Sequence, residues 1–280
     1  MKDSEIVIIG ANGQLGLALQ KRYPGAVALD RQQLDITDQK VVNDFDWSHT
    51  KVIINAAAWT DVDAAEKPEN FEQVDLVNHQ AVQYLADAAK AHNLTLMQIS
   101  SDYVFDGSQP THREDELFSP LNIYGKSKAA GDLAAATAPK HYVIRTSWVI
   151  GDGKNFVSIM QDLAKRGIKP SVVNDQIGRL TFTDTLARGI KHLLETGAPY
   201  GTYNLTNEGP PTNWAEIAKI VFEKSGKSVS EVTPVSTTEY FTNKPGVAQR
   251  PLQSTLDLTK IEEAGFTPED WRDKLDNLLA

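Results

Sequence analysis

The sequence of 280 residues predicts an α/β protein with a doubly wound parallel sheet and a smaller C-terminal lobe. Three observations predict this class. Short apolar segments alternate with helical segments through the first half of the chain, a glycine-rich turn follows the first apolar segment, and the second half is less regular. Short apolar strands separated by helices are typical of a parallel sheet covered on both faces.

The first half supplies alternating strands and helices. The helix expected over residues 78–92 shows the clearest periodicity, with Ala81, Leu85, Ala88 and Ala89 on one side. Strands are expected at residues 5–9, 26–29, 52–55, 94–99 and 141–144, and helices at 15–22, 41–45, 78–92 and 124–136.

The second half is expected to form most of the smaller lobe. Helices are expected at residues 156–166, 184–196 and 214–225, a strand at 201–205, and loops around Pro170, Pro210–Pro211 and Pro245–Arg250. We expect a sheet domain over residues 1–148 and a lobe over 149–280. Segments near residues 181–205 and 240–260 are expected to return to the sheet domain.

Composition excludes several classes of site and partner. The chain has no cysteine, so it has no disulfide, zinc-thiolate site or cysteine nucleophile. Its net charge of -9 argues against a nucleic-acid surface, which needs clustered lysine and arginine. The apolar runs are too short for a membrane span or a signal peptide. We therefore expect a cytoplasmic protein without a membrane or nucleic-acid partner.

The glycine-rich turn after the first strand points to dinucleotide binding. Gly10, Gly13 and Gly16 recur every third residue between a strand and a helix. Gly10 permits a sharp turn, Gly13 permits close approach to a pyrophosphate, and Gly16 permits close packing of helix on strand. The helix start offers free N–H groups to phosphate. This arrangement predicts a Rossmann-type fold that binds NAD or NADP.

The end of the second strand carries opposing signals about the cofactor. Asp30 is suited to accept a hydrogen bond from a ribose hydroxyl, whereas Arg31 is suited to bind a 2′-phosphate. The choice between NAD and NADP therefore stays open. Asp35, a few residues further on, is expected to lie near the adenine of the cofactor, or alternatively to cap a helix.

A candidate catalytic set follows from spacing and strand ends. Tyr124 and Lys128 stand four residues apart on a predicted helix, which places both side chains on one face. A neighbouring ammonium is expected to lower the phenol pKa, and such a tyrosine can protonate a carbonyl oxygen. Ser101 ends a predicted strand, where ligands of open α/β sheets bind. We interpret Ser101, Tyr124 and Lys128 as a Ser–Tyr–Lys catalytic set.

These motifs together resemble the extended short-chain dehydrogenase/reductases, and most closely the family of dTDP-4-dehydrorhamnose reductases. The resemblance spans nearly the whole chain, and Pro120 to Lys128 is its most specific part. The matching segments are the glycine loop and residues 55–63, 101–107, 120–128, 145–149, 155–156, 173–178 and 250–251.

The resemblance implies an NAD(P)H-dependent reduction of the 4-keto group of dTDP-4-dehydro-L-rhamnose, giving dTDP-L-rhamnose for cell-envelope polysaccharide. It makes residues 1–148 an NAD(P)-binding domain and the lobe mainly substrate-binding. It implies catalytic roles for Ser101, Tyr124 and Lys128. The implied cofactor contacts are Gly10, Gly13, Gln14, Leu15, Gly16, Asp30, Arg31, Asp35, Ile36, Ala56, Ala57, Ala58, Thr60, Tyr124 and Lys128, and the implied substrate contacts are Ser101, Asp102, Trp148 and Arg250.

Two departures from the family pattern bear on assembly and on one loop. Some relatives dimerise around a magnesium held by acidic residues, one of them on the first helix, but residues 17–20 here are Leu-Ala-Leu-Gln. We therefore expect a monomer or homodimer, no bound metal and no metal-linked dimer. Leu180 replaces the usual proline of a Gly-x-Pro-Thr turn, which affects no proposed catalytic group.

Two alternative functions remain open at this point. One is a reductase or epimerase acting on another nucleotide sugar, since these enzymes share the Tyr–Lys chemistry. A dehydratase is disfavoured because Tyr103 stands where the usual glutamate follows Asp102. The other alternative is a non-catalytic NAD(P)-binding regulatory subunit, for which loss of the Tyr–Lys pair would have been a signal.

Overall fold

The computed structural model describes residues 1–242 and 246–280 and contains a parallel sheet of six strands in the order β10-β5-β4-β3-β1-β2. The chain order reverses beside β1, which pairs with both β2 and β3. A ligand site of an open α/β sheet lies at such a switch point. The strands are β1 (Ile6–Ile9), β2 (Val27–Leu29), β3 (Val52–Asn55), β4 (Thr95–Ser101), β5 (His141–Thr146) and β10 (Gly201–Asn204).

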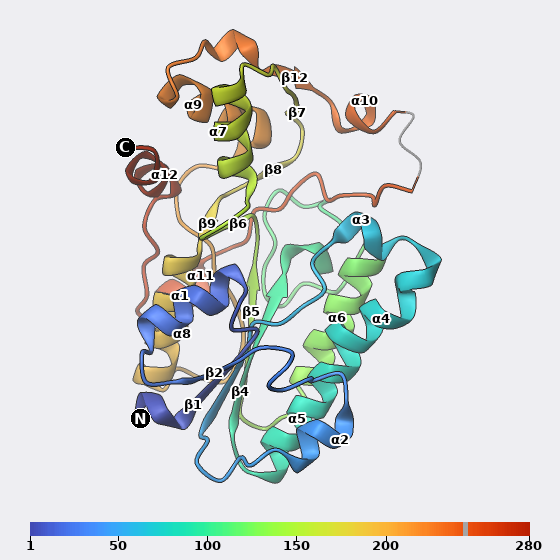
Figure 1. The fold of residues 1–280 in the computed structure, drawn as a ribbon, viewed down its shortest axis with the longest axis vertical. Helices are drawn as coiled ribbons and strands as arrows, with labels where there is room; N and C mark the ends of the chain where they lie inside the picture. Colours follow the sequence, from blue (N-terminus) through green and yellow to red (C-terminus); the bar gives the residue numbers. More distant parts are fainter. Residues whose placement is uncertain (243–245) are drawn as a thin grey trace.

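Helices cover both faces of this sheet, with α1 and α8 on one face and α2, α4, α5 and α6 on the other (Figure 1). Alternate residues of β1 serve the two faces: Val7 and Ile9 enter one core cluster, and Ile6 and Ile8 enter the other. The helices are α1 (Gln14–Arg22), α2 (Gln39–Asp44), α3 (Val62–Ala65), α4 (Phe71–Asp75), α5 (Ala81–Ala91), α6 (Ile123–Ala135), α8 (Thr183–Thr196) and α11 (Thr259–Glu263).

The helix expected over residues 78–92 starts earlier and is irregular. It continues from α4 through a π-helical turn, Leu76–Gln80, into α5. Asn78 lies in this wide turn, and a Cβ added to Gly131 of α6 would come within 2.2 Å of the Asn78 carbonyl oxygen. Gly131 therefore permits α6 to pack closely against the turn.

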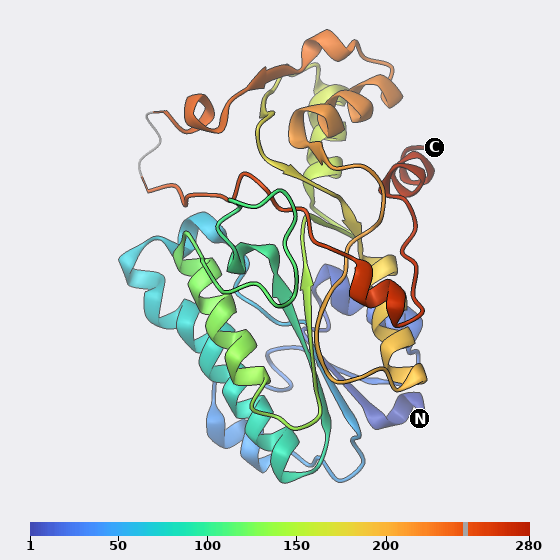
Figure 2. The ribbon, with the colours of Figure 1, turned by 180° about the vertical axis from the view of Figure 1, so that it is seen from behind.

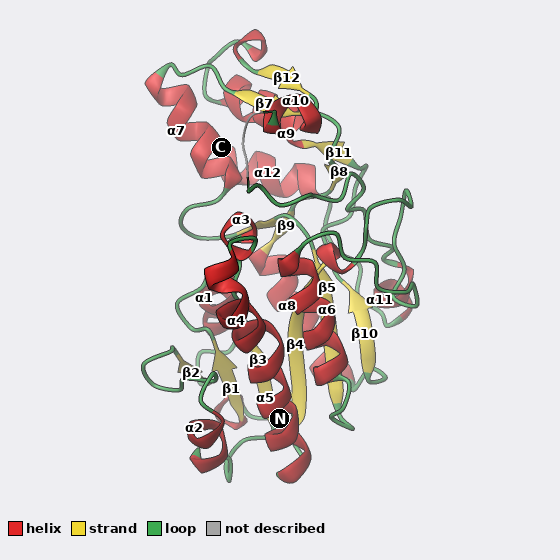
Figure 3. Cartoon of the chain, turned by 90° about the vertical axis from the view of Figure 1, so that its right-hand side faces the viewer, coloured by secondary structure: helices red, strands yellow, loops and turns green. Residues whose placement is uncertain are grey.

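The lobe has its own apolar core and lies beyond one end of the sheet (Figure 1). Its short strands pair two by two: β6 with β9, β7 with β12, and β8 with β11. Figure 3 shows β7 beside β12 and β8 beside β11. Pro170 and Pro210–Pro211 lie in loops as expected, and Pro245 lies outside the described residues. The lobe elements are β6 (Val149–Ile150), α7 (Phe156–Arg166), β7 (Ser171–Val173), β8 (Ile177–Gly178), β9 (Thr181–Phe182), β11 (Thr212–Asn213), α9 (Trp214–Lys224), β12 (Thr233–Val235), α10 (Thr237–Phe241) and α12 (Trp271–Leu279).

Two later segments of the chain return to the sheet. α8 packs against α1, and β10 extends the sheet beside β5. The segment after residue 246 crosses the molecule between the lobe and the sheet (Figure 2). It makes bridges at Gln253 with Ile177 of the lobe and at Leu256 with His112. The division of the chain near residue 148 stays a prediction.

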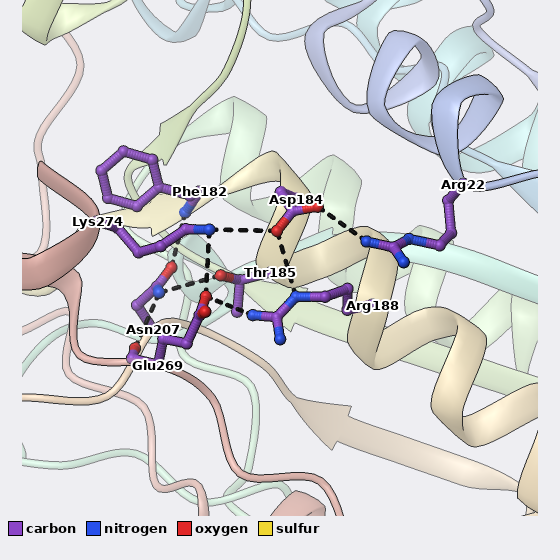
Figure 4. A network of polar contacts seen from close by, with 8 residues as sticks. All are labelled: Arg22, Phe182, Asp184, Thr185, Arg188, Asn207, Glu269 and Lys274. Atoms are coloured by element: carbon purple, nitrogen blue, oxygen red, sulfur yellow. Dashed lines mark hydrogen bonds and ion pairs between the residues drawn. The ribbon is translucent and has the colours of Figure 1, made fainter. Parts of the chain in front are cut away.

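A cluster of charged side chains joins α1, α8 and α12 (Figure 4). The Asp184 carboxylate accepts hydrogen bonds from Arg22 at 3.0 Å, from Arg188 at 3.2 Å and from Lys274 at 3.2 Å. Glu269 is paired with the same Arg188 and Lys274. The terminal helix of the lobe is thereby tied to α8, which packs beside the helix that follows the glycine loop.

Candidate functional site

A cleft of about 1040 Å³ lies between the carboxyl edge of the sheet and the lobe. The glycine loop, the loop after β3, the end of β4 and the start of α6 contribute to its walls. From the lobe side it is closed by Trp148, residues 152–154 and Trp214. Of the predicted site residues, the lining includes Gly10, Gly13, Gln14, Leu15, Ala56, Ala57, Ala58, Thr60, Ser101, Asp102, Tyr124, Lys128 and Trp148.

The glycine loop has the geometry that its spacing predicts. Gly10 adopts a φ of +84°, and a Cβ there would lie 2.7 Å from the Ala57 nitrogen. A Cβ on Gly16 would lie 2.2 Å from the Gly10 carbonyl oxygen, so only glycine permits this packing. Gly13 precedes α1 without a side-chain cap, which leaves the first N–H groups of α1 facing the cleft.

The end of β2 is joined to the glycine loop by a side-chain contact. Asn12 lines the cleft, and its amide donates a hydrogen bond to the Asp30 carboxylate at 3.1 Å. Arg31 is paired with Asp35 at 3.3 Å, and the Arg31 side chain is 70% exposed. Asp30, Arg31, Asp35 and Ile36 do not line the cleft, and neither does Gly16. Their roles toward a cofactor stay predictions.

Ser101, Tyr124 and Lys128 meet in the cleft. Ser101 ends β4, while Tyr124 and Lys128 lie one turn apart near the start of α6, whose N-cap Asn122 accepts a hydrogen bond from the Gly125 nitrogen at 2.7 Å. Lys128 is 2% exposed, and its ammonium donates to the Ile99 carbonyl oxygen at 2.6 Å. This backbone contact anchors the lysine beside the catalytic face of the helix.

The protonation states of this set are determined mainly by burial. Burial raises the pKa of Tyr124 to about 12, the Ser101 hydroxyl lowers it, and the Asp102 and Asp132 carboxylates raise it. The expectation that Lys128 lowers the phenol pKa is wrong, because burial dominates and the ammonium donates to Ile99 instead. Burial lowers the pKa of Lys128 to about 8, and Asp132 opposes this change. At neutral pH the pair is a neutral phenol beside an ammonium.

Two predicted substrate-binding residues, Asp102 and Arg250, form polar contacts with other residues of the protein. Asp102 is 3% exposed, and its carboxylate accepts a hydrogen bond from the Ser101 hydroxyl at 3.1 Å. Arg250 does not line the cleft. Its guanidinium forms an ion pair at 2.8 Å with the Asp63 carboxylate of α3 and donates a hydrogen bond to the Ala248 carbonyl oxygen. Arg250 therefore fastens the C-terminal segment to the region around α3, and substrate contact by either residue stays a prediction.

Trp148 is held in an uncommon backbone conformation at the junction of sheet and lobe. Its φ is +47°, which costs a non-glycine residue about 1–3 kcal/mol and is frequent at ligand sites. Its ring stacks on Trp214 at a centroid distance of 3.9 Å. Gly178 permits this placement, because a Cβ there would lie 2.9 Å from the Trp148 ring.

Sequence reasoning missed several residues of the site. Trp214 was assigned only to an amphipathic helix, and no local signal connects it with Trp148. Asn78 is buried in the π turn, where it exchanges hydrogen bonds with the Trp59 backbone and donates to the Ser127 hydroxyl at 3.0 Å. π turns are frequent at functional sites. Asn78 thereby links the loop after β3 to α6, which carries Tyr124.

The fold and the cleft define the class of the protein: it is an extended short-chain dehydrogenase/reductase, and members of this class are NAD(P)-dependent oxidoreductases. A family model described as RmlD substrate binding domain matches residues 4–280, and the chain belongs to this family. The predicted family resemblance and fold class are therefore confirmed.

Individual relatives agree with this assignment. A dTDP-4-dehydrorhamnose reductase from Aggregatibacter actinomycetemcomitans is 40% identical, with 99% of each chain covered. The crystal structure of a dTDP-4-dehydrorhamnose reductase from Clostridium acetobutylicum is 36% identical, with 100% of this chain and 99% of that chain covered and a TM-score of 0.90. The Bacillus anthracis enzyme, solved in complex with NADP, is also 36% identical, with 99% and 98% covered and a TM-score of 0.90.

The described residues were also compared with the requirements of a membrane-spanning helix and of a metal site. Within residues 1–242 and 246–280, no helix combines the length and apolar character needed to cross a membrane. In the same part of the chain, no three His, Cys, Asp or Glu side chains are grouped so that they could hold a metal ion.

Proposed function

We propose that the protein reduces the C4 keto group of dTDP-4-dehydro-L-rhamnose with NAD(P)H, giving dTDP-L-rhamnose. The observation that carries this proposal is the meeting of Ser101, Tyr124 and Lys128 in the same cleft as the glycine loop. The relative from Aggregatibacter, similar over 99% of both chains, is named for the same reduction.

The glycine loop and the start of α1 would hold the cofactor's pyrophosphate. The turn at Gly10 and the close packing at Gly16 leave no room for side chains there, and the uncapped N–H groups of α1 are suited to an anion. Ala56, Ala57, Ala58 and Thr60 would line the nicotinamide side, and Asp30, Arg31, Asp35 and Ile36 would lie toward the adenosine. The bound cofactor supplies the hydride that adds to C4 of the sugar.

Tyr124 supplies the proton that completes the reduction. Its raised pKa keeps the phenol protonated at neutral pH, so the phenol O–H can donate to the carbonyl oxygen as that oxygen becomes an alkoxide. Lys128, whose ammonium is held by the Ile99 carbonyl oxygen, would bind the nicotinamide ribose of the cofactor. Ser101 orients the carbonyl oxygen. One hydride and one proton are thereby added, which balances the conversion of ketone to alcohol.

The lobe would provide the substrate side of the cleft. The stacked Trp148 and Trp214 present an aromatic surface opposite the catalytic set, which suits the apolar face of a deoxysugar. Asp102 and Arg250 are further proposed contacts of the nucleotide sugar. Location in the cytoplasm and assembly as a monomer or homodimer belong to the same proposal.

The proposal is tested by NAD(P)H oxidation with a panel of 4-keto nucleotide sugars. We expect turnover to be fastest with dTDP-4-dehydro-L-rhamnose and to fall roughly 100-fold or more in Tyr124→Phe. Faster reduction of another nucleotide sugar, or release of an epimer without cofactor oxidation, would replace the proposed substrate. Cofactor binding without turnover of any sugar would instead favour the regulatory role.

A further inference from the structure

A loop of the lobe, Gly151 to Asn155, reaches across to the helix that follows the glycine loop. Asp152 is paired with Lys21 of α1 at 2.6 Å, and the Gln14 side chain donates to the Lys154 carbonyl oxygen at 3.4 Å. A Cβ on Gly151 would lie 3.0 Å from the Gln14 Cβ. This loop, named here the crossing loop, therefore lies against the first turn of α1.

The crossing loop is held in one shape by its own contacts with α7. The Asn155 side chain caps α7 and donates to the carbonyl oxygens of Gly151 at 2.7 Å and Gly153 at 3.2 Å. Gly153 has a φ of +94°, which glycine adopts readily. The position of Lys154 over the cleft is thereby determined by both the lobe and α1.

Among the residues that the structure describes, four charged ones line the cleft: Asp102, Lys128, Asp152 and Lys154. Three of them already have partners. Lys128 is buried and bonded to the Ile99 carbonyl oxygen, Asp102 is buried and bonded to Ser101, and Asp152 is paired with Lys21. Lys154 is exposed, and among the described residues its ammonium takes part in none of the hydrogen bonds or ion pairs. Of these four charged groups, the Lys154 ammonium is therefore the one that is available to a ligand.

We propose that Lys154 binds the pyrophosphate of the dinucleotide cofactor from the lobe side, opposite the N–H groups of α1. The inference rests on the proposed function, which makes the cleft a dinucleotide site. A lysine acts on phosphate as a mobile point charge, and the start of α1 is itself favourable for an anion. Lys154 and Gly13 line the same cleft, and the Lys154 carbonyl oxygen accepts a hydrogen bond from Gln14, the residue after Gly13. The lysine side chain therefore starts beside the position expected for the phosphates. Cofactor binding would then draw lobe and sheet domain together.

The test uses Lys154→Met, which keeps an apolar side chain of similar length but removes the charge. Dissociation constants for NADH and NADPH are measured by fluorescence titration without sugar. We expect both to rise about 3- to 10-fold, since an exposed charge is partly screened by solvent. Lys154→Arg should restore binding. Lys165→Ala, which removes an exposed lysine of α7 outside the cleft, is the control with the same change in net charge.

A separate titration with dTDP distinguishes the possible sources of the phosphate. A loss confined to NADPH would overturn the proposal, because it would place Lys154 at the 2′-phosphate. A loss confined to dTDP, titrated separately, would also overturn it, because Lys154 would then serve the sugar nucleotide. Unchanged constants for all three ligands in Lys154→Met refute the inference while the wild type still binds cofactor; a wild type that binds neither NADH nor NADPH refutes the proposed function as well.

Discussion

The pH dependence of cofactor use follows from the burial of Lys128. Burial lowers the pKa of this lysine to about 8, and the Asp132 carboxylate on the next turn of α6 opposes the change. Asp132 is itself buried and paired with Arg145 at 3.0 Å. Lys128 loses its charge as the pH rises through its pKa, so catalysis that needs the ammonium declines on the alkaline side.

The expected size of the decline follows from this pKa. With a value of about 8, roughly nine tenths of Lys128 is charged at pH 7 and roughly one tenth at pH 9. We therefore expect kcat/KM for NADPH, which reports the free enzyme, to fall about tenfold between these two pH values. Tyr124, with a pKa of about 12, stays neutral over this range and adds no second decline.

Asp132→Asn tests the cause of this decline. Removing the carboxylate removes a group that raises the pKa of Lys128, so the alkaline limb should move to lower pH. The assay is NADPH oxidation at saturating sugar between pH 6 and 10, on protein whose folding is checked by circular dichroism. Asp87→Asn, which removes an exposed carboxylate of α5, should leave the limb in place. A flat wild-type profile to pH 9.5, or an unmoved limb in Asp132→Asn, would refute the reasoning.

Three further predictions concern the proton donor, the glycine loop and cofactor choice. Tyr124→Phe should lower kcat roughly 100-fold or more, the scale of general-acid catalysis, with cofactor affinity retained; near-normal turnover would remove Tyr124 from the mechanism. Gly13→Val should weaken NADH and NADPH binding while the protein stays folded, since a Cβ there meets only the Gly10 oxygen, at 3.4 Å. Gly16→Val should instead lower the melting temperature, because its Cβ would lie 2.2 Å from that oxygen. Arg31→Ala should weaken NADPH binding by about 1 kcal/mol, given the exposure of Arg31, and leave NADH unchanged; equal losses would mean that Arg31 does not face the 2′-phosphate.

The parts of the fold that were predictable have strong local signals. β1 is entirely apolar, β3 is apolar up to its last residue, and both are buried along their whole length. The glycine spacing depends on backbone conformation alone. The spacing of Tyr124 and Lys128 fixes their common helix face. The strands of the lobe, β6 to β9, β11 and β12, are two or three residues long and too short to show any periodicity.

The parts of the site that were missed depend on contacts between distant segments. Trp214 reaches Trp148 across more than sixty positions of sequence, and Lys154 reaches Gln14 only because the crossing loop folds over α1. The sequence predicts that the pKa of Tyr124 is lowered, whereas burial raises it. Helical spacing does not show how deeply a side chain is buried, so the direction of this shift could not be predicted. The ion pair of Arg250 with Asp63 joins segments far apart in the sequence and was not predicted, while contact of Arg250 with the substrate stays a prediction.

The central claim is that the cleft delivers hydride to C4 of a dTDP-linked 4-ketosugar. The most direct measurement uses NADPH carrying deuterium at the transferred position, with dTDP-4-dehydro-L-rhamnose as substrate and NMR analysis of the product. We predict dTDP-L-rhamnose with one deuterium, at C4, formed by the wild type and formed roughly 100-fold or more slowly by Tyr124→Phe. Product without deuterium at C4, or deuterium at another carbon, would contradict it.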